Sequence, residues 1–209
     1  DIKTIAFESE DITVDILKYL ESNTSLKWIP VSNLISTIRS IKDEKEIALI
    51  QKSIDITDNS FNTISETIKP GMTEKEISWE LEKHIRILGA ESLSFDTIVA
   101  SGPNSAKPHH SPSNRKIRKG EPIVIDMGSK FSGYCSDLTR TVYIGKPDKI
   151  YNRIYDTVLV AQLTAIETLQ KGMTGKNIDK LARTLITDAG FGDNFGHSLG
   201  HGVGLEVHE

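Results

Sequence analysis

Three of the six histidines in this chain lie within its last thirteen residues, at His197, His201 and His208. They alternate with glycines, which allow a backbone to approach a ligand closely. A His-x-x-x-His pair on a helix would present both imidazoles to zinc, but the glycines of this segment disfavour a helix. We therefore expect residues 197–209 to form an extended or bulged strand at a functional site.

Two aspartates lie where predicted strands bring carboxylates together. Asp126 ends an apolar strand predicted over 123–127, and Asp137 lies on a returning strand predicted over 134–144. Carboxylates on adjacent antiparallel strands repel each other, and a shared cation relieves the repulsion. In the alternative interpretation Asp126 is a turn residue and Asp137 pairs with Arg140. Together with the terminal histidines, the aspartates favour a metal site with nitrogen and oxygen ligands.

A third group of polar residues lies in a proline-containing loop predicted over 102–114, which carries His109 and His110. One interpretation is a mobile loop with two surface histidines. In the functional interpretation the loop folds a histidine over the metal site, where it carries a proton or donates to an oxyanion.

The elements that must position these residues fall into two parts. Residues 1–40 resemble the end of an α/β unit, with strands over 2–7 and 26–31 and a helix over about 12–21 capped by Asp11. A strand is also predicted over 95–101. Four helices are predicted in the second part: 43–68, capped by Asp43 with Glu46 in a capping box; 74–88; 148–170; and 175–188.

A weak internal repeat relates the two helix pairs. Lys69-Pro70-Gly71-Met72-Thr73 separates the first pair, and Lys171-Gly172-Met173-Thr174 separates the second. The repeat predicts a pseudo-two-fold domain in which helix pairs cover one sheet. The alternative is two unrelated helical hairpins with similar turn residues.

Composition restricts the class of protein. The chain is 37% hydrophobic and 26% charged, which is typical of a globular protein. Its net charge of −4 provides no footprint for nucleic acid or an anionic membrane, and the basic stretch 115–119 is interpreted as a solvated loop. The single cysteine, Cys135, excludes an internal disulfide framework. No stretch approaches the roughly 18 apolar residues of a membrane span, so we expect a cytoplasmic protein.

These motifs together resemble the pita-bread metallopeptidases, in the branch of aminopeptidase P and Xaa-Pro dipeptidase (prolidase). The resemblance rests on His109 in Ser-Ala-Lys-Pro-His, Asp126 in Asp-Met-Gly, Asp137 in Ser-Asp-Leu-Thr-Arg-Thr and the terminal histidine run. It implies an α+β pita-bread fold, a pseudo-two-fold antiparallel sheet covered by helix pairs. Residues 41–209 would be the catalytic domain, and residues 1–40 the tail of a smaller α/β N-terminal domain.

The resemblance also implies a role for each site residue. Asp126 would bind one of two divalent metals, Asp137 would bridge both, and His201 would bind the other. The residues expected to line the substrate pocket, and to bind the scissile carbonyl or handle protons, are His109, His197 and His208. Manganese is the expected metal, with cobalt and zinc as alternatives. The implied reaction hydrolyses the bond preceding proline in a peptide or dipeptide, and a homodimer is expected.

The family's site uses two further glutamates after the histidine run, and this chain ends at Glu209. Two divalent ions carry four positive charges, whereas Asp126 and Asp137 supply only two negative ones. We therefore expect a chain truncated at both ends, whose catalytic domain is incomplete at the C-terminus. As a separate piece it should bind little metal and show negligible peptidase activity.

Other members of the fold class are the alternatives. Methionine aminopeptidases usually lack a preceding domain and the His208-Glu209 ending of the run, and creatinase-like hydrolases need no metal. A non-catalytic protein-binding module typically loses the ligand residues. Asp126, Asp137 and His201 argue against the last two alternatives.

Overall fold

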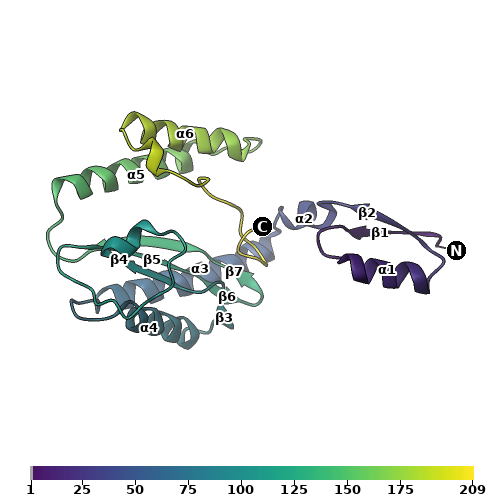
Figure 1. Cartoon of the computed structure of the whole chain (residues 1–209), viewed down its shortest axis with the longest axis horizontal. Helices are drawn as coiled ribbons and strands as arrows, with labels where there is room; N and C mark the ends of the chain where they lie inside the picture. The colour runs from purple at the N-terminus through teal and green to yellow at the C-terminus, as the bar shows by residue number, and fades with distance from the viewer. Residues whose placement is uncertain (1) are drawn as a thin grey trace.

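The computed structural model describes residues 2–209. Near the N-terminus, β1 (Thr4–Glu8) and β2 (Lys27–Val31) pair in parallel, and α1 (Val14–Asn23) connects them. The predicted strand–helix–strand order is confirmed. The predicted cap is wrong: Thr13 rather than Asp11 is the N-cap, because its hydroxyl accepts from the Ile16 N–H one turn into the helix. Figure 1 shows this unit projecting away from the rest of the chain.

A short helix that the sequence did not predict, α2 (Leu34–Arg39), leads into the first long helix pair. α3 (Glu44–Ser65) begins at the predicted capping box of Asp43 and Glu46, which is confirmed. α4 (Glu74–Ile87) begins at a second capping box, in which Thr73 and Glu76 exchange hydrogen bonds. Each box satisfies N–H groups that a helix start leaves without partners.

The strands following α4 form two small antiparallel sheets. β4 (Ile98–Ser101), β5 (Pro122–Met127) and β8 (Leu138–Tyr143) make one, in the order β4-β5-β8. β3 (Ser92–Leu93), β6 (Ser129–Phe131) and β7 (Tyr134–Cys135) make the other, in the order β3-β6-β7.

The single returning strand predicted over 134–144 is wrong, since the chain changes partner between β7 and β8. β7 pairs with β6, whereas β8 pairs with β5. Ser136 lies in the break, where its hydroxyl accepts from the Ser129 N–H at 3.0 Å. Asp137 consequently occupies the connection that enters β8 rather than a strand position.

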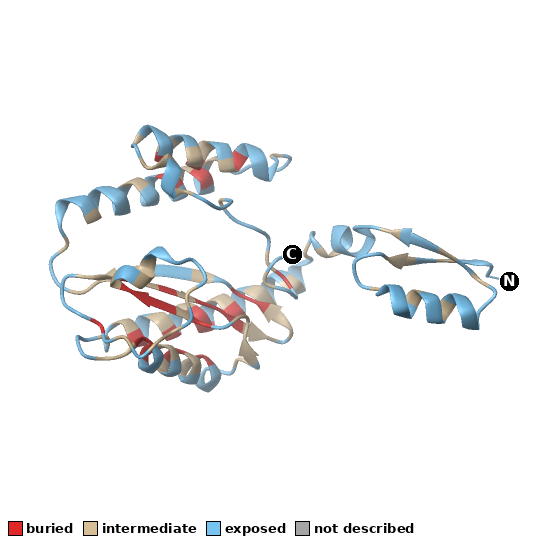
Figure 2. Cartoon of the chain, viewed as in Figure 1, coloured by how far each residue is buried: buried red, intermediate tan, exposed pale blue. Residues whose placement is uncertain are grey.

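The core lies between this sheet and the first helix pair. Alternate residues of β5, Ile123, Ile125 and Met127, are buried in one cluster with Ile77 and Leu81 of α4. Figure 2 shows the buried residues concentrated along β5 and the facing helices. Because side chains alternate along a strand, Val124 and Asp126 point to the opposite face of the sheet.

The second helix pair repeats the local construction of the first. α5 (Lys149–Thr168) begins at the N-cap Asp148, and α6 (Gly175–Asp188) begins at the N-cap Thr174. The turn between them contains Gly172 at φ +90°, matching Gly71 at φ +97° in the first pair. Glycine adopts this left-handed conformation without a steric penalty, which accounts for the matching turn residues.

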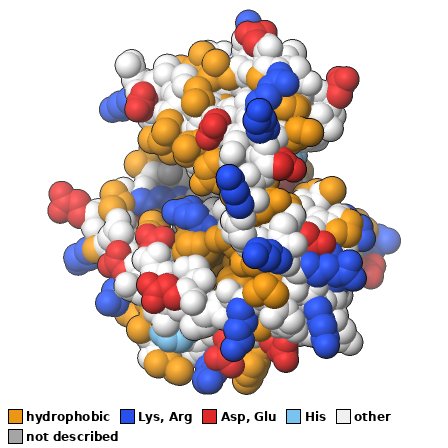
Figure 3. All heavy atoms as spheres, turned by 90° about the vertical axis from the view of Figure 1, so that its left-hand side faces the viewer, with side chains coloured by type: hydrophobic (Ala, Val, Ile, Leu, Met, Phe, Trp, Pro, Cys, Tyr) orange, Lys and Arg blue, Asp and Glu red, His pale blue; other side chains and the backbone are white. Residues whose placement is uncertain are grey.

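Apolar side chains remain exposed on α5. The large ones with the greatest exposure are Ile150, Val158, Val160 and Ile166. Figure 3 shows hydrophobic side chains gathered over the upper part of the molecule and in the hollow beneath it. Within the described residues, no helix is both long and apolar enough to cross a membrane.

The terminal run forms no strand in the part of the chain that the structure describes, so that prediction is wrong. After η2 (Gly192–Asn194) the run is irregular and ends near α2 (Figure 1). Its backbone groups form local turns instead of a ladder. The Gly204 N–H donates to Glu206 O at 3.0 Å, and the Glu209 N–H donates to Gly202 O at 3.1 Å.

We predict that Gly128→Ala destabilises the protein by about 3 kcal/mol or prevents folding. A Cβ at Gly128 would overlap the Ser136 carbonyl oxygen, which lies in the strand break, and the Ser94 hydroxyl that donates to it. Gly175→Ala is the matched control, because nothing lies within 4 Å of its Cβ position. Thermal unfolding should show a much lower melting temperature for Gly128→Ala and a nearly unchanged one for Gly175→Ala. Equal melting temperatures would contradict the prediction.

Candidate metal centre

Asp126 occupies the open face of the sheet at the end of β5. Thr139, its partner in β8, donates a hydroxyl hydrogen bond to Asp126 Oδ1 at 2.7 Å. Partial burial raises the pKa of Asp126, and the nearby carboxylate of Asp137 adds to the rise, although the Thr139 hydrogen bond opposes it. Asp137, in the connection that enters β8, thus lies close to a carboxylate that is already poorly hydrated.

Asp137 faces His201 of the terminal run. Their Oδ2 and Nε2 atoms are 3.2 Å apart. The Arg140 guanidinium donates to the Thr139 carbonyl oxygen at 3.0 Å. This contact takes the place of the ion pair between Arg140 and Asp137 that the alternative interpretation expected. The structure therefore brings together the three residues expected as metal ligands.

The orientation of the His201 ring tests whether a metal fits. Its Nδ1 lies 2.9 Å from the Gly202 carbonyl oxygen, which only accepts hydrogen bonds, so Nδ1 carries the hydrogen. In the neutral ring Nε2 is then an acceptor, and it faces the acceptor oxygen of Asp137. Two facing acceptors at this distance need a proton or a cation between them.

The donor set suits a divalent ion. Two carboxylates and a neutral imidazole, whose second nitrogen is fixed by a carbonyl, are the ligands and the supporting contact found in mixed metal sites. Among residues 2–209, however, no three His, Cys, Asp or Glu side chains are arranged to hold an ion by themselves. Asp126, Asp137 and His201 are thus neighbours that fit a metal chemically without forming a closed cage.

The two other histidines of the run, His197 and His208, have different neighbours. The His208 ring stacks at a tilt on the His201 ring, with centroids 4.1 Å apart. His197 contacts the edge of Phe195, and its carbonyl accepts from Arg183 of α6 at 2.8 Å. The structure therefore places His208 beside the proposed ligand, and places His197 next to α6.

Two acidic residues whose ion pairs sequence reasoning missed, Asp179 and Glu209, hold the run in place. Asp179 pairs with Arg183 one turn later on α6, and its carboxylate also accepts from the Leu199 N–H at 2.9 Å. Glu209, almost fully buried, binds Lys42 at 2.7 Å and also pairs with Arg39. The Asp179–Arg183 pair could have been predicted, because the two residues are four apart on one predicted helix. The partners of Glu209 could not, because they lie far from it in the sequence.

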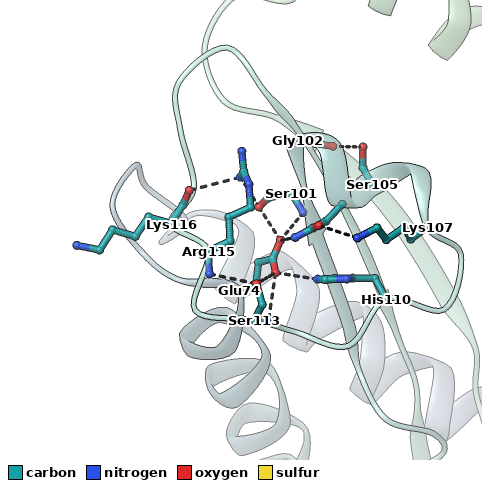
Figure 4. A network of polar contacts seen from close by, with 10 residues as sticks. Glu74, Ser101, Gly102, Ser105, Lys107, His110, Ser113, Arg115 and Lys116 are labelled. Carbon is teal, nitrogen blue, oxygen red and sulfur yellow. Dashed lines mark hydrogen bonds and ion pairs between the residues drawn. The ribbon is translucent and has the colours of Figure 1, made fainter.

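The loop histidines separate into an exposed one and one whose side chain is largely buried. His109 is exposed, whereas His110 turns inward and lies 2.8 Å from the buried carboxylate of Glu74 (Figure 4). Sequence reasoning missed Glu74, because an acid in the first turn of a helix is ordinarily a solvated residue that favours the helix dipole.

Comparison with known proteins agrees with this fold. The model of metallopeptidase family M24 matches residues 48–209. The Xaa-Pro dipeptidase of Pyrococcus horikoshii is 41% identical over 209 residues, which are 100% of this chain and 59% of that protein. The chain therefore spans about three fifths of the length of this curated relative.

Solved structures match equally well. A Xaa-Pro dipeptidase from Bacillus anthracis superposes with a TM-score of 0.97 at 41% identity, over 99% of this chain and 58% of that one. An X-Pro aminopeptidase from Thermotoga maritima superposes with a TM-score of 0.93 at 44% identity, over 100% of this chain and 59% of that one. The fold is thus the α+β fold of these metal-dependent peptidases. The chain belongs to metallopeptidase family M24, and the resemblance to its Xaa-Pro branch is confirmed.

We predict that Asp126→Asn raises the melting temperature of the metal-free protein at neutral pH by about 2–4 °C. Asparagine still accepts from Thr139 and removes one of two adjacent charges. Because the folded-state pKa of Asp126 is raised, its ionisation costs stability as pH rises from about 4 through that pKa. The variant should lack this decline when both proteins are unfolded in chelator across pH 4 to 8. A lower melting temperature at pH 7 would contradict the prediction.

Proposed function

We propose that the intact protein is a dinuclear-metal peptidase that hydrolyses the bond preceding proline in a dipeptide or peptide. The contact between Asp137 and His201 beside Asp126 is the observation that carries the proposal, since it requires a positive charge and the members of family M24 are metallopeptidases. The names of the relatives, a Xaa-Pro dipeptidase and an X-Pro aminopeptidase, supply the substrate class.

The proposal extends to the architecture. Residues 41–209 form the catalytic part, in which the two helix pairs are the related halves of a pita-bread domain. Residues 1–40 are the end of a smaller N-terminal domain. The matching turns at Gly71 and Gly172 support the relation between the halves.

Each proposed ligand has a position that suits its role. Asp126 would hold one divalent ion, His201 the other, and Asp137, which neighbours both, would bridge them. Manganese suits this oxygen-rich set, and cobalt and zinc are alternatives. Such a pair of ions supplies Lewis acidity and an activated water at neutral pH. Because two aspartates leave four positive charges half neutralised, the intact site needs further carboxylates.

Three further histidines, His109, His197 and His208, act on the substrate. His208, whose ring stacks beside that of His201, would donate to the carbonyl oxygen as that oxygen gains negative charge. An amide of proline leaves as a secondary amine, which must receive a proton. His109 and His197 are exposed, and either ring would deliver that proton or bind the substrate carbonyl. His197 would do so through Nε2, because its Nδ1 contacts the Ser198 carbonyl oxygen at 2.7 Å.

We predict that Asp137→Asn in the intact protein abolishes stoichiometric metal binding and lowers kcat/KM on a Xaa-Pro dipeptide at least about a thousandfold. An amide neither supplies negative charge nor bridges two cations. Metal should be counted by elemental analysis after dialysis, and turnover measured with manganese in excess.

Asp188→Asn is the matched control, because it makes the same change at an exposed position at the end of α6. It should keep both metal and turnover. Retained turnover with bound metal in the Asp137 variant would refute the ligand assignment. Metal binding without cleavage of any Xaa-Pro substrate by the wild type would refute the substrate class alone.

A further inference from the structure

Glu74 is a fully buried carboxylate that holds both ends of the histidine loop. Its Oε1 accepts from the Ser101 N–H at 2.8 Å, from the Ser101 hydroxyl at 2.7 Å and from the Asn104 amide at 3.0 Å. Its Oε2 accepts from the Ser113 N–H at 3.0 Å, from the Ser113 hydroxyl at 2.6 Å and from His110 Nε2 at 2.8 Å. Figure 4 shows these groups converging on Glu74.

The hydrogen bonds keep this carboxylate ionised. Burial alone would raise the pKa of Glu74, but the donors from Ser113, Asn104, His110 and Ser101 outweigh burial and hold that pKa well below its ordinary value. An ionised carboxylate only accepts hydrogen bonds, so His110 must donate from Nε2. The contact therefore fixes the orientation of the His110 ring as well as its position.

The two oxygens divide the loop between them. Oε1 binds its beginning, at Ser101 and Asn104, and Oε2 binds its far end, at His110 and Ser113. Between these points η1 (Gly102–Ala106) packs against β4 and β5. Arg115 strengthens the closure, because it donates to the Ser101 hydroxyl at 2.7 Å and pairs with Glu121 beside β5. One carboxylate thus closes the loop at its base.

The consequence for the His-His pair is a division of roles. His110 is turned inward, with only 11% of its side chain exposed, whereas His109, its immediate neighbour, is exposed. A chain whose residue 110 is held inward has little freedom at residue 109. Restriction of this kind matters for a group that transfers a proton, because small misplacements lower the rate strongly.

We propose that Glu74 is a positioning residue, which through His110 holds the loop in the conformation that presents His109 to the substrate. The part of this inference that concerns catalysis rests on the proposed peptidase function. The part that concerns loop order stands on the contacts alone.

Two substitutions at position 110 isolate the contact. His110→Gln places a side-chain amide N–H where Nε2 donated, whereas His110→Leu leaves similar bulk without a donor. Glu74→Gln removes the negative charge and replaces one acceptor oxygen by an amide N–H, which would face the N–H and O–H donors of the loop. Glu80→Gln is the control for the last variant, because Glu80 lies on the same helix and its side chain is 41% exposed.

We predict that Glu74→Gln and His110→Leu speed amide hydrogen exchange in residues 101–114 at least about tenfold, with α3 and β5 unchanged. On a Xaa-Pro dipeptide both variants should lose at least about tenfold in kcat, with KM within about threefold, because a proton carrier acts in the transition state. His110→Gln should restore slow exchange and bring kcat within about threefold of the wild type. Glu80→Gln should behave as the wild type. Hydrogen exchange by mass spectrometry and steady-state kinetics of the intact protein provide both readouts.

The readouts separate this inference from the proposed function. If the wild type cleaves no Xaa-Pro substrate, the peptidase function fails, and exchange in residues 101–114 still decides whether Glu74 and His110 order the loop. If Glu74→Gln does not fold, the two variants at position 110 decide. Equal exchange and equal kcat in His110→Gln and His110→Leu would overturn the proposal. A loop that loosens while kcat is kept would overturn the positioning role.

Discussion

The alternation of side chains along β5 determines which side of the sheet carries chemistry. Ile123, Ile125 and Met127 are buried against α3 and α4, and burial of each contributes about 1.5–3 kcal/mol. A one-residue change of register would expose all three and drive Asp126 into the core, where a lone carboxylate is strongly unfavourable. Apolar burial and charge hydration therefore favour the same register. The carboxylate has no alternative to the open face, where Asp137 and His201 of the terminal run lie near it.

Features that depend on neighbours in the sequence were predicted well. The capping box at Asp43 and the glycine turns of both helix pairs involve residues within one helical turn of each other, so their pattern is visible in the sequence. The contact of Asp137 with His201 was inferred from residue types and a family resemblance rather than from spacing, because the two residues lie far apart in the chain. The error at Asp11 was also local, since Thr13, another favoured N-cap residue, lies only two residues further on.

The roles of Glu74 and Glu209 were beyond prediction for a physical reason. Most of the partners of Glu74 are backbone N–H groups and serine hydroxyls, which every loop contains, so residue types do not mark the site. Glu209 depends on Lys42, which precedes it by most of the length of the chain. Glutamate is ordinarily a surface residue, so its residue type predicts exposure at both positions. Both acids become buried because the fold closes polar groups around them and offsets the loss of hydration.

The terminal run shows how an irregular segment can still be well placed. Three anchors fix its backbone: Leu199 binds Asp179, Gly204 accepts from the Cys135 N–H at 2.7 Å, and Glu209 binds Lys42. A Cβ at Gly202 or Gly204 would overlap Glu209, so these glycines allow the run to fold back closely on itself, as a straight strand would not. The His201 tautomer is then selected by the neighbouring Gly202 carbonyl. Orientation of the ring is therefore a property of the run itself, and the neutral ring would present Nε2, which faces Asp137, to a metal ion.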